Sequence, residues 1–185
     1  MADVTSKHVA ILVENYFEES EFVKPKEALE SAGALTTVVS TGEENLQAMK
    51  HDVEKGDTFM PDLTIEDVMF EDYDMLVVPG GVVNADKLRM NEKAREWVRY
   101  CMDNEIPLAV ICHGPWLLVS ADVVNGMKLT SYYTLQDDIR NAGGTWEDKE
   151  LVIDGNLITS RNPHDLPAFC GAIIDTLAHT PALVY

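Results

Sequence analysis

The residue best placed to do chemistry in this sequence is Cys112, which ends an apolar run and is followed by His113 and a Gly-Pro pair. An unbroken apolar run indicates a strand buried on both faces of a parallel sheet. A reactive side chain where such a strand turns into a helix is a nucleophile elbow. The helix N-terminus would face the thiol, and its partial positive charge favours a thiolate with a lowered pKa. We interpret Cys112 as a candidate nucleophile; the alternative, a small buried hydrophobic residue, is what we expect for Cys101 and Cys170.

A cysteine nucleophile also needs a proton acceptor and a group that polarises the electrophile. His113 is the nearest base in the sequence, but neighbouring side chains on a turning backbone usually point apart, so a plain turn residue is the alternative. Backbone amides at Gly80-Gly81, together with the His113 amide, would make an oxyanion hole, against the simpler interpretation of a tight turn.

A run of carboxylates follows the first predicted strand. For Glu19 and Glu21 the pattern favours a solvated helix face. Glu18, nearest the strand end, is the one expected to reach Cys112. When ionised it would oppose a thiolate, whereas when protonated it can donate a hydrogen bond to one, and desolvation favours the protonated form.

The composition restricts the class of protein. The chain has 185 residues, 46% hydrophobic and 25% charged, which is typical of one globular domain spanning 1–185. Three widely separated cysteines and no visible signal peptide indicate a cytoplasmic protein without a disulfide framework. A net charge of −18 opposes binding to nucleic acid backbones and to anionic membranes. The histidines show no metal-ligand spacing and no dinucleotide fingerprint is present, so we expect neither a metal nor a cofactor.

Strands and helices are predicted to alternate along most of the chain, which indicates a doubly wound α/β sheet with helices on both faces. In such sheets, sites form beyond the carboxyl ends of the strands, so residues 14–19, Gly80-Gly81 and Cys112-His113 should converge. The region 41–61 is expected to be irregular, with an edge hairpin around 55–57. Strands are predicted at 7–13, 35–40, 74–78, 107–111, 127–130, 151–153 and 156–160, and helices at 18–32, 91–104, 115–120, 135–142 and 162–179.

Taken together, six segments resemble the ThiJ/PfpI family, which includes intracellular proteases, protein deglycases, glyoxalases and stress chaperones. Each segment is weak alone, but their order and spacing are specific, and the resemblance is greatest to the protease I branch. The segments are NYFEESEF at 15–22, VPGG at 78–81, AVICHGP at 109–115, TSY at 130–132, DIRNAGG at 138–144 and DGNLITSR at 154–161.

This resemblance implies a flavodoxin-like sandwich, similar to class I glutamine amidotransferases, with Cys112 as the nucleophile. It further implies that Glu18 donates a hydrogen bond to the sulfur and that the Gly81 and His113 amides form the oxyanion hole. In the protease I branch the histidine pairs with an acidic residue of a neighbouring subunit. The matching position here is Asp86, which implies a homo-oligomer.

The activity implied is that of a stress-response cysteine hydrolase without a cofactor. Its substrates would be peptides or small carbonyl adducts, such as those of methylglyoxal and glyoxal. Two other functions fit the same residues. The protein could sense or scavenge oxidants through oxidation of Cys112, or it could bind unfolded chains as a chaperone does.

Overall fold

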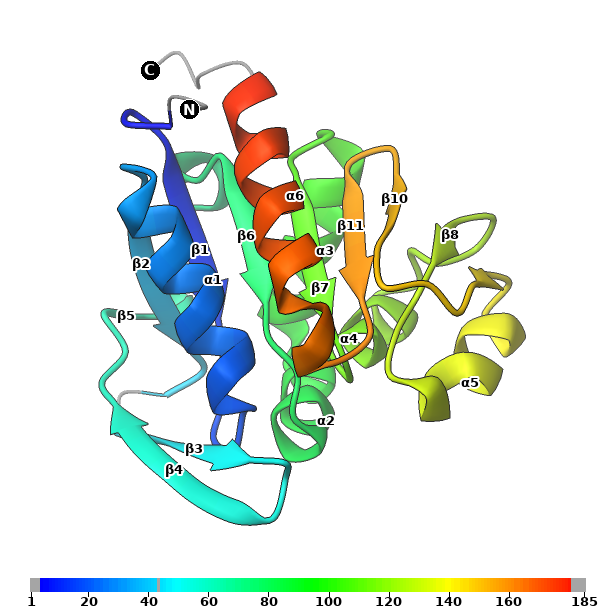
Figure 1. Ribbon diagram of the computed structural model, residues 1–185, viewed down its shortest axis with the longest axis horizontal. Helices are drawn as coiled ribbons and strands as arrows, with labels where there is room; N and C mark the ends of the chain where they lie inside the picture. The colour runs from blue at the N-terminus through cyan, green and yellow to red at the C-terminus, as the bar shows by residue number, and fades with distance from the viewer. Residues whose placement is uncertain (1–3, 43, 181–185) are drawn as a thin grey trace.

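The computed structural model describes residues 4–42 and 44–180, and a seven-stranded sheet lies at its centre (Figure 1). The strand order is β10-β11-β7-β6-β1-β2-β5, and all neighbours are parallel except β10 and β11. This confirms the predicted α/β sheet. Its strands are β1 (His8–Leu12), β2 (Leu35–Ser40), β5 (Leu63–Thr64), β6 (Met75–Val78), β7 (Leu108–Ile111), β10 (Val152–Asp154) and β11 (Leu157–Ser160).

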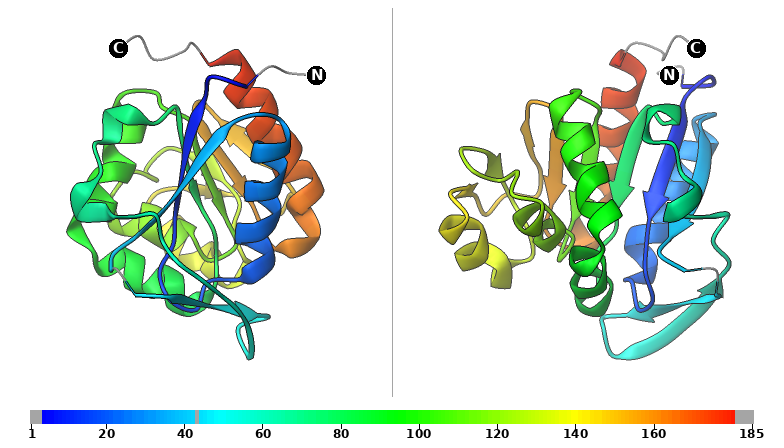
Figure 2. Two further views of the ribbon diagram at one scale, coloured as in Figure 1. Left: turned by 90° about the vertical axis from the view of Figure 1, so that its left-hand side faces the viewer. Right: turned by 180° about the vertical axis from the view of Figure 1, so that it is seen from behind.

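Helices cover both faces of this sheet, as the two views of Figure 2 show. The side chains of β6 and β7 are buried on both faces, which explains their unbroken apolar sequences. One apolar core lies beneath α1 and α6, and a second beneath α3 and α4. The helices are α1 (Glu19–Ser31), α2 (Val82–Met90), α3 (Glu92–Asp103), α4 (Pro115–Ser120), α5 (Gln136–Asn141) and α6 (Leu166–His179). None in the described part of the chain is long and apolar enough to cross a membrane.

The strands β1, β6 and β7 are neighbours at the centre of the sheet and point the same way. Their carboxyl ends therefore bring together three connections that are far apart in the sequence. These are the loop from β1 to α1, the Gly80-Gly81 turn after β6, and Cys112-His113 after β7. The convergence expected from the sequence is present.

The region 41–61 is more regular than predicted. It forms an antiparallel hairpin of β3 (Leu46–Lys50) and β4 (Glu54–Phe59), which lies below the ends of β1 and β6 in Figure 1. The turn is at His51 and Asp52, whose φ angles are 55° and 61°, and the predicted turn at 55–57 is wrong because those residues belong to β4. A contact with the start of α1 fixes the turn: the His51 N–H donates to Glu18 Oε2 at 2.7 Å.

A strand predicted at 127–130 is present, but its partner strand and a helix directly after Gly81 were not predicted. The helix α2 follows Gly81 directly, and its sequence has little amphipathic pattern, because only Asn84, Ala85 and Leu88 are buried. The short strands β8 (Lys128–Leu129) and β9 (Thr145–Trp146) pair in parallel beside α5 instead of joining the main sheet. Both depend on contacts with distant segments, which local patterns do not record.

Candidate active site

Cys112 lies at a strained turn between β7 and α4. Its φ is 62°, in the left-handed region that residues other than glycine rarely adopt. The turn is held by backbone bonds, because the Cys112 N–H donates to Ser160 O at 3.1 Å and its carbonyl accepts from Tyr132 N–H at 2.7 Å. Only 6% of the residue is exposed. This is the geometry of a nucleophile elbow, as the sequence predicts.

The elbow folds the His113 side chain back toward the sulfur. Cys112 Sγ lies 3.2 Å from His113 Nδ1, so these adjacent side chains do meet. The ring stacks on Tyr132 with a centroid distance of 4.6 Å, and Nε2 lies 3.5 Å from the Thr134 hydroxyl oxygen. Burial lowers the pKa of His113, which favours the neutral ring near pH 7. A neutral Nδ1 can accept the proton of the thiol.

The carboxyl group beside the sulfur belongs to Glu21, which corrects the assignment of this contact to Glu18. Glu21 is fully buried, it interacts with Cys112, and its Oε2 accepts from Gly80 N–H at 2.8 Å. Glu18 instead accepts from the Ser20 hydroxyl and the His51 N–H. The solvated position expected for Glu21 is therefore wrong. The helical spacing of the sequence could have indicated this burial, because Glu21 lies on the same side of α1 as the buried residues Phe22, Pro25 and Leu29.

Burial sets the protonation of this pair. It raises the pKa of Glu21 to about 8, with the neighbouring Glu18 charge acting in the same direction, so Glu21 carries a proton at neutral pH. Burial also raises the pKa of the Cys112 thiol, and the lowered pKa predicted from the helix N-terminus is not found. The resting site thus holds a thiol, an acceptor imidazole and a neutral carboxyl group that can donate a hydrogen bond.

Glycine is required at the turn after β6 because the chain passes so close to the elbow. A Cβ at Gly80 would lie 2.4 Å from Glu21 Oε2 and 2.6 Å from Cys112 Cβ. Gly81 has a φ of 94°, and its N–H is directed at the Cys112 sulfur. The N–H of His113 has no acceptor among the described residues. Both amides predicted for an oxyanion hole therefore lie at the elbow; their role in catalysis stays a prediction.

Asp86 is exposed on α2, and no contact among the described residues joins it to His113. Within one subunit it is thus apart from the other predicted site residues. Its role as an acid supplied by a neighbouring subunit stays a prediction.

A cavity of about 130 Å³ opens onto the sulfur. A second cavity, of about 470 Å³, shares Glu18, His51 and Pro163 with the first as lining residues. The residues that line the smaller cavity come from six separate segments: Glu18, Glu21, His51, Asp52, Gly81, Cys112, Tyr132 and Pro163. No sequence pattern pointed to His51, Asp52 or Tyr132 as site residues, because only the packing of the hairpin and of the loop after β8 brings them here.

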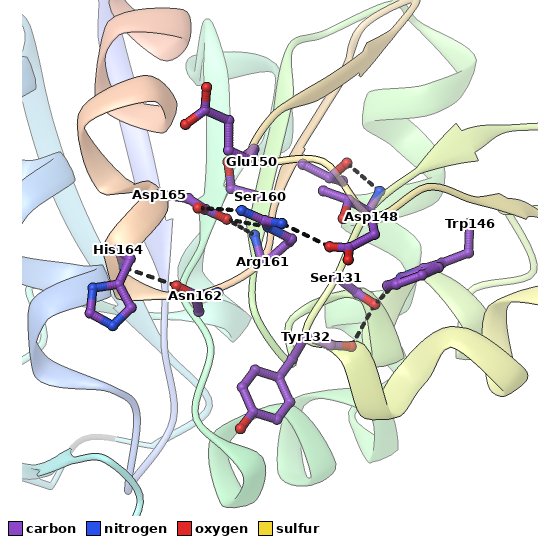
Figure 3. Close-up of polar contacts among 12 residues, drawn as sticks. Ser131, Tyr132, Trp146, Asp148, Glu150, Ser160, Arg161, Asn162, His164 and Asp165 are labelled. Atoms are coloured by element: carbon purple, nitrogen blue, oxygen red, sulfur yellow. Dashed lines mark hydrogen bonds and ion pairs between the residues drawn. The ribbon is translucent and has the colours of Figure 1, made fainter.

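A network of ion pairs centres on Arg161, as Figure 3 shows. Arg161 binds Asp165 through Nε at 2.8 Å and Asp148 through a terminal nitrogen at 2.7 Å, and so fixes the segment that contributes Pro163. The Tyr132 ring points away from these ion pairs in Figure 3. Within the described residues, no group of three or more His, Cys, Asp or Glu side chains is arranged to ligate a metal ion.

Comparisons with known proteins place the chain in one family. The model of the DJ-1/PfpI family matches residues 7–176. A protein of Archaeoglobus fulgidus is 45% identical over 169 residues, which cover 91% of this chain and 97% of that protein. The putative cysteine protease YraA of Bacillus subtilis is 36% identical, over 89% of this chain and 94% of its own. The crystal structure of Drosophila melanogaster DJ-1beta superposes with a TM-score of 0.85 at 30% identity, covering 94% of this chain and 91% of that one. This chain is therefore a member of the DJ-1/PfpI family.

Proposed function

We propose that the protein is a cysteine-dependent hydrolase that acts on small carbonyl adducts or short peptides. The observation that carries this proposal is the 3.2 Å contact between Cys112 Sγ and His113 Nδ1 on a strained elbow. A thiol that is protonated at rest needs a base at hydrogen-bonding distance in order to attack, and a neutral imidazole provides one. The cysteine protease name of the Bacillus relative is consistent with this chemistry.

In the proposed reaction, His113 takes the thiol proton as Cys112 Sγ adds to the carbonyl carbon. The oxyanion that forms accepts hydrogen bonds from the Gly81 and His113 amides. With an amide substrate, the leaving amine takes the proton from His113 and a thioester remains on the sulfur. Water then loses a proton to His113 as it attacks the thioester, the acid product leaves, and the proton returns to the sulfur.

The size of the cavity supports small substrates. The cavity of about 130 Å³ next to the sulfur can hold a group of a few heavy atoms. The adjoining cavity of about 470 Å³ has room for the rest of the substrate. A methylglyoxal adduct of an amine is an aminocarbinol, so the sulfur displaces the amine at the carbinol carbon: the C–N bond breaks, the amine takes the proton from His113, and a hemithioacetal remains on the sulfur. Its breakdown releases methylglyoxal and returns the proton to the sulfur. The cavity therefore favours the adduct, whose reacting part is compact, as the substrate class.

The test is turnover of methylglyoxal adducts of N-acetylated amino acids and of a fluorogenic peptide. Cys112→Ala should reduce turnover to the uncatalysed rate, because the nucleophile is lost. Cys170→Ala, which changes a half-buried cysteine outside the cavity, is the matched control and should retain full turnover. Retained turnover in Cys112→Ala would refute the proposal.

A second candidate function, sensing of oxidants, is favoured by the neutral Glu21 carboxyl group beside the sulfur. A protonated carboxyl group can donate a hydrogen bond to a sulfenate or sulfinate, the first products of cysteine oxidation. Treatment with low peroxide, followed by mass spectrometry, separates the two functions. Rapid oxidation of Cys112 in a protein that turns over neither substrate would favour the sensor.

A further inference from the structure

Asp52 lies in the turn between β3 and β4. It lines the cavity together with Cys112 and Tyr132. Its Oδ1 accepts from the N–H of Val82, the residue after Gly81, at 2.9 Å, and its Oδ2 has no hydrogen-bond partner in the described part of the chain. The carboxylate is thus tied to the turn that carries the Gly81 amide, at the solvent-exposed edge of the cavity.

The backbone at this turn is strained. His51 and Asp52 both have positive φ angles, at a type of hairpin turn in which Asn and Gly are the usual residues. The left-handed conformation costs on the order of 1 kcal/mol for each such residue. Bonds to Glu18 on one side and Val82 on the other hold the turn in place. Strain of this kind, at a cavity that contains a nucleophile, is typical of functional positions.

His113 lies between two residues of the cavity wall, since it contacts the Cys112 sulfur and stacks on Tyr132. The Cys112 thiol and the Tyr132 phenol are in contact with His113. The other titratable groups that line the same cavity are Glu18, Glu21, His51 and Asp52. At neutral pH the thiol and Glu21 hold their protons. Burial lowers the pKa of His113, and the charge of Asp52 acts in the opposite direction.

We infer that Asp52 is the positioning acid of His113 and that the hairpin of the same subunit supplies it. Its negative charge stabilises the imidazolium that forms when His113 takes the proton of Cys112. The site would then be complete within one subunit, with the charge coming from Asp52 instead of Asp86. This inference rests on the proposed role of His113 as the base.

The test is an NMR titration of the His113 imidazole in protein labelled at the histidine rings, with the resonance assigned by its absence in His113→Gln. In Asp52→Asn the pKa of His113 should fall by about half a unit at low ionic strength, because a nearby negative charge is removed. Asn Oδ1 still accepts from Val82 N–H, so the turn is retained. Asp52→Ser, whose hydroxyl can accept the same bond, provides a second neutral variant with the same expectation.

Asp52→Glu restores the charge and should return the titration toward that of the wild type, which a purely structural role would not predict. Asp86→Asn is the matched control and should leave the His113 titration unchanged. An unchanged titration in folded Asp52→Asn and Asp52→Ser, or an equal shift in Asp86→Asn, would overturn the inference. Because the titration is read without turnover, this failure is separate from retained turnover in Cys112→Ala, which would refute the hydrolase.

Discussion

At the scale of single residues, three side chains define this site through the effects of burial. Burial makes His113 a weaker base, so that its ring is neutral and can accept a proton. It also holds the proton on Cys112 and on Glu21, which share the space beside Gly80. The site thus holds a thiol at rest and not a thiolate at a helix N-terminus, and in the proposed reaction His113 activates this thiol as it attacks.

The buried carboxyl group of Glu21 makes stability depend on pH. Its pKa is about 8 in the folded protein and near 4.5 when unfolded, so the folded state binds more protons between these values. The free energy of unfolding should therefore fall as the pH rises from about 4.5 to 8. Glu21→Gln removes this dependence and keeps an acceptor for Gly80 N–H.

Urea denaturation at pH 5 and pH 8 checks this prediction. The free energy of unfolding of the wild type should fall between pH 5 and pH 8 by on the order of 3 kcal/mol more than that of Glu21→Gln. Each unit of pKa difference corresponds to about 1.4 kcal/mol. The difference in stability between the two proteins at pH 5 serves as the internal control, because the raised Glu21 pKa has cost the wild type little stability at that pH. An equal change in the free energy of unfolding of both proteins between pH 5 and pH 8 would contradict a raised Glu21 pKa.

At the scale of elements, the site depends on how closely the ends of β6 and β7 and the start of α1 approach one another. The Glu18 N–H donates to Gly80 O at 3.2 Å, and the buried Asn84 side chain donates to the carbonyls of Pro79 and Gly80. These bonds fix the turn after β6, and with it the direction of the Gly81 N–H. The turn is a rigid part of the site because each of its polar groups has a specific partner.

Gly81→Ala tests this close approach. A Cβ there would lie 2.7 Å from Tyr16 O and 2.8 Å from Glu18 N, in addition to the unfavourable positive φ. Gly126→Ala is the matched control, since Gly126 also has a positive φ, of 80°, but no atom lies within 4 Å of its Cβ position. We expect Gly126→Ala to cost about 1 kcal/mol of stability.

Gly81→Ala should cost roughly 2 kcal/mol more than the control, because backbone atoms must move to relieve the contacts. Turnover should fall at least tenfold in Gly81→Ala, because one oxyanion donor is displaced. It should be unchanged in Gly126→Ala. Thermal unfolding measures the loss of stability, and steady-state kinetics measures the loss of turnover. Equal losses in Gly81→Ala and Gly126→Ala would show that Gly81 does not lie tightly against the backbone of residues 16–18.

At the scale of the whole molecule, the net charge of −18 surrounds a site that itself contains carboxyl groups. Such a field repels anions, and the effect is screened by salt over a distance of about 10 Å at 0.1 M. The charge therefore favours neutral or cationic substrates over anionic ones.

Alkylation of Cys112 by two reagents of different charge measures this field. Neutral iodoacetamide should alkylate Cys112 faster than anionic iodoacetate. The ratio of these two rates should be larger for Cys112 than for a small neutral thiol. The ratio should fall toward that of the small thiol as NaCl is raised from 0.05 to 0.5 M. Peptide mapping by mass spectrometry identifies the alkylated cysteine. Iodoacetate reacting as fast as iodoacetamide at low salt would show that the site does not experience the field.

The sequence alone determined the sheet, the elbow and the place where the site forms. Unbroken apolar runs mark strands buried on both faces, and parallel strands bring their carboxyl ends to one edge, so order and pattern placed Cys112, His113 and Gly81 together there. Roles for His113 and Gly81 came from the resemblance to a known family.

Which acids lie at the sulfur depends on the packing of segments that are distant in the sequence. Glu18 and Glu21 are one helical turn apart, and the packing of α1 buries the second beside Cys112. Asp52 reaches the cavity because a hairpin folds back over the ends of the strands. The directions of the pKa shifts followed in the same way, because desolvation depends on what surrounds a group in space and not on its neighbours in the chain.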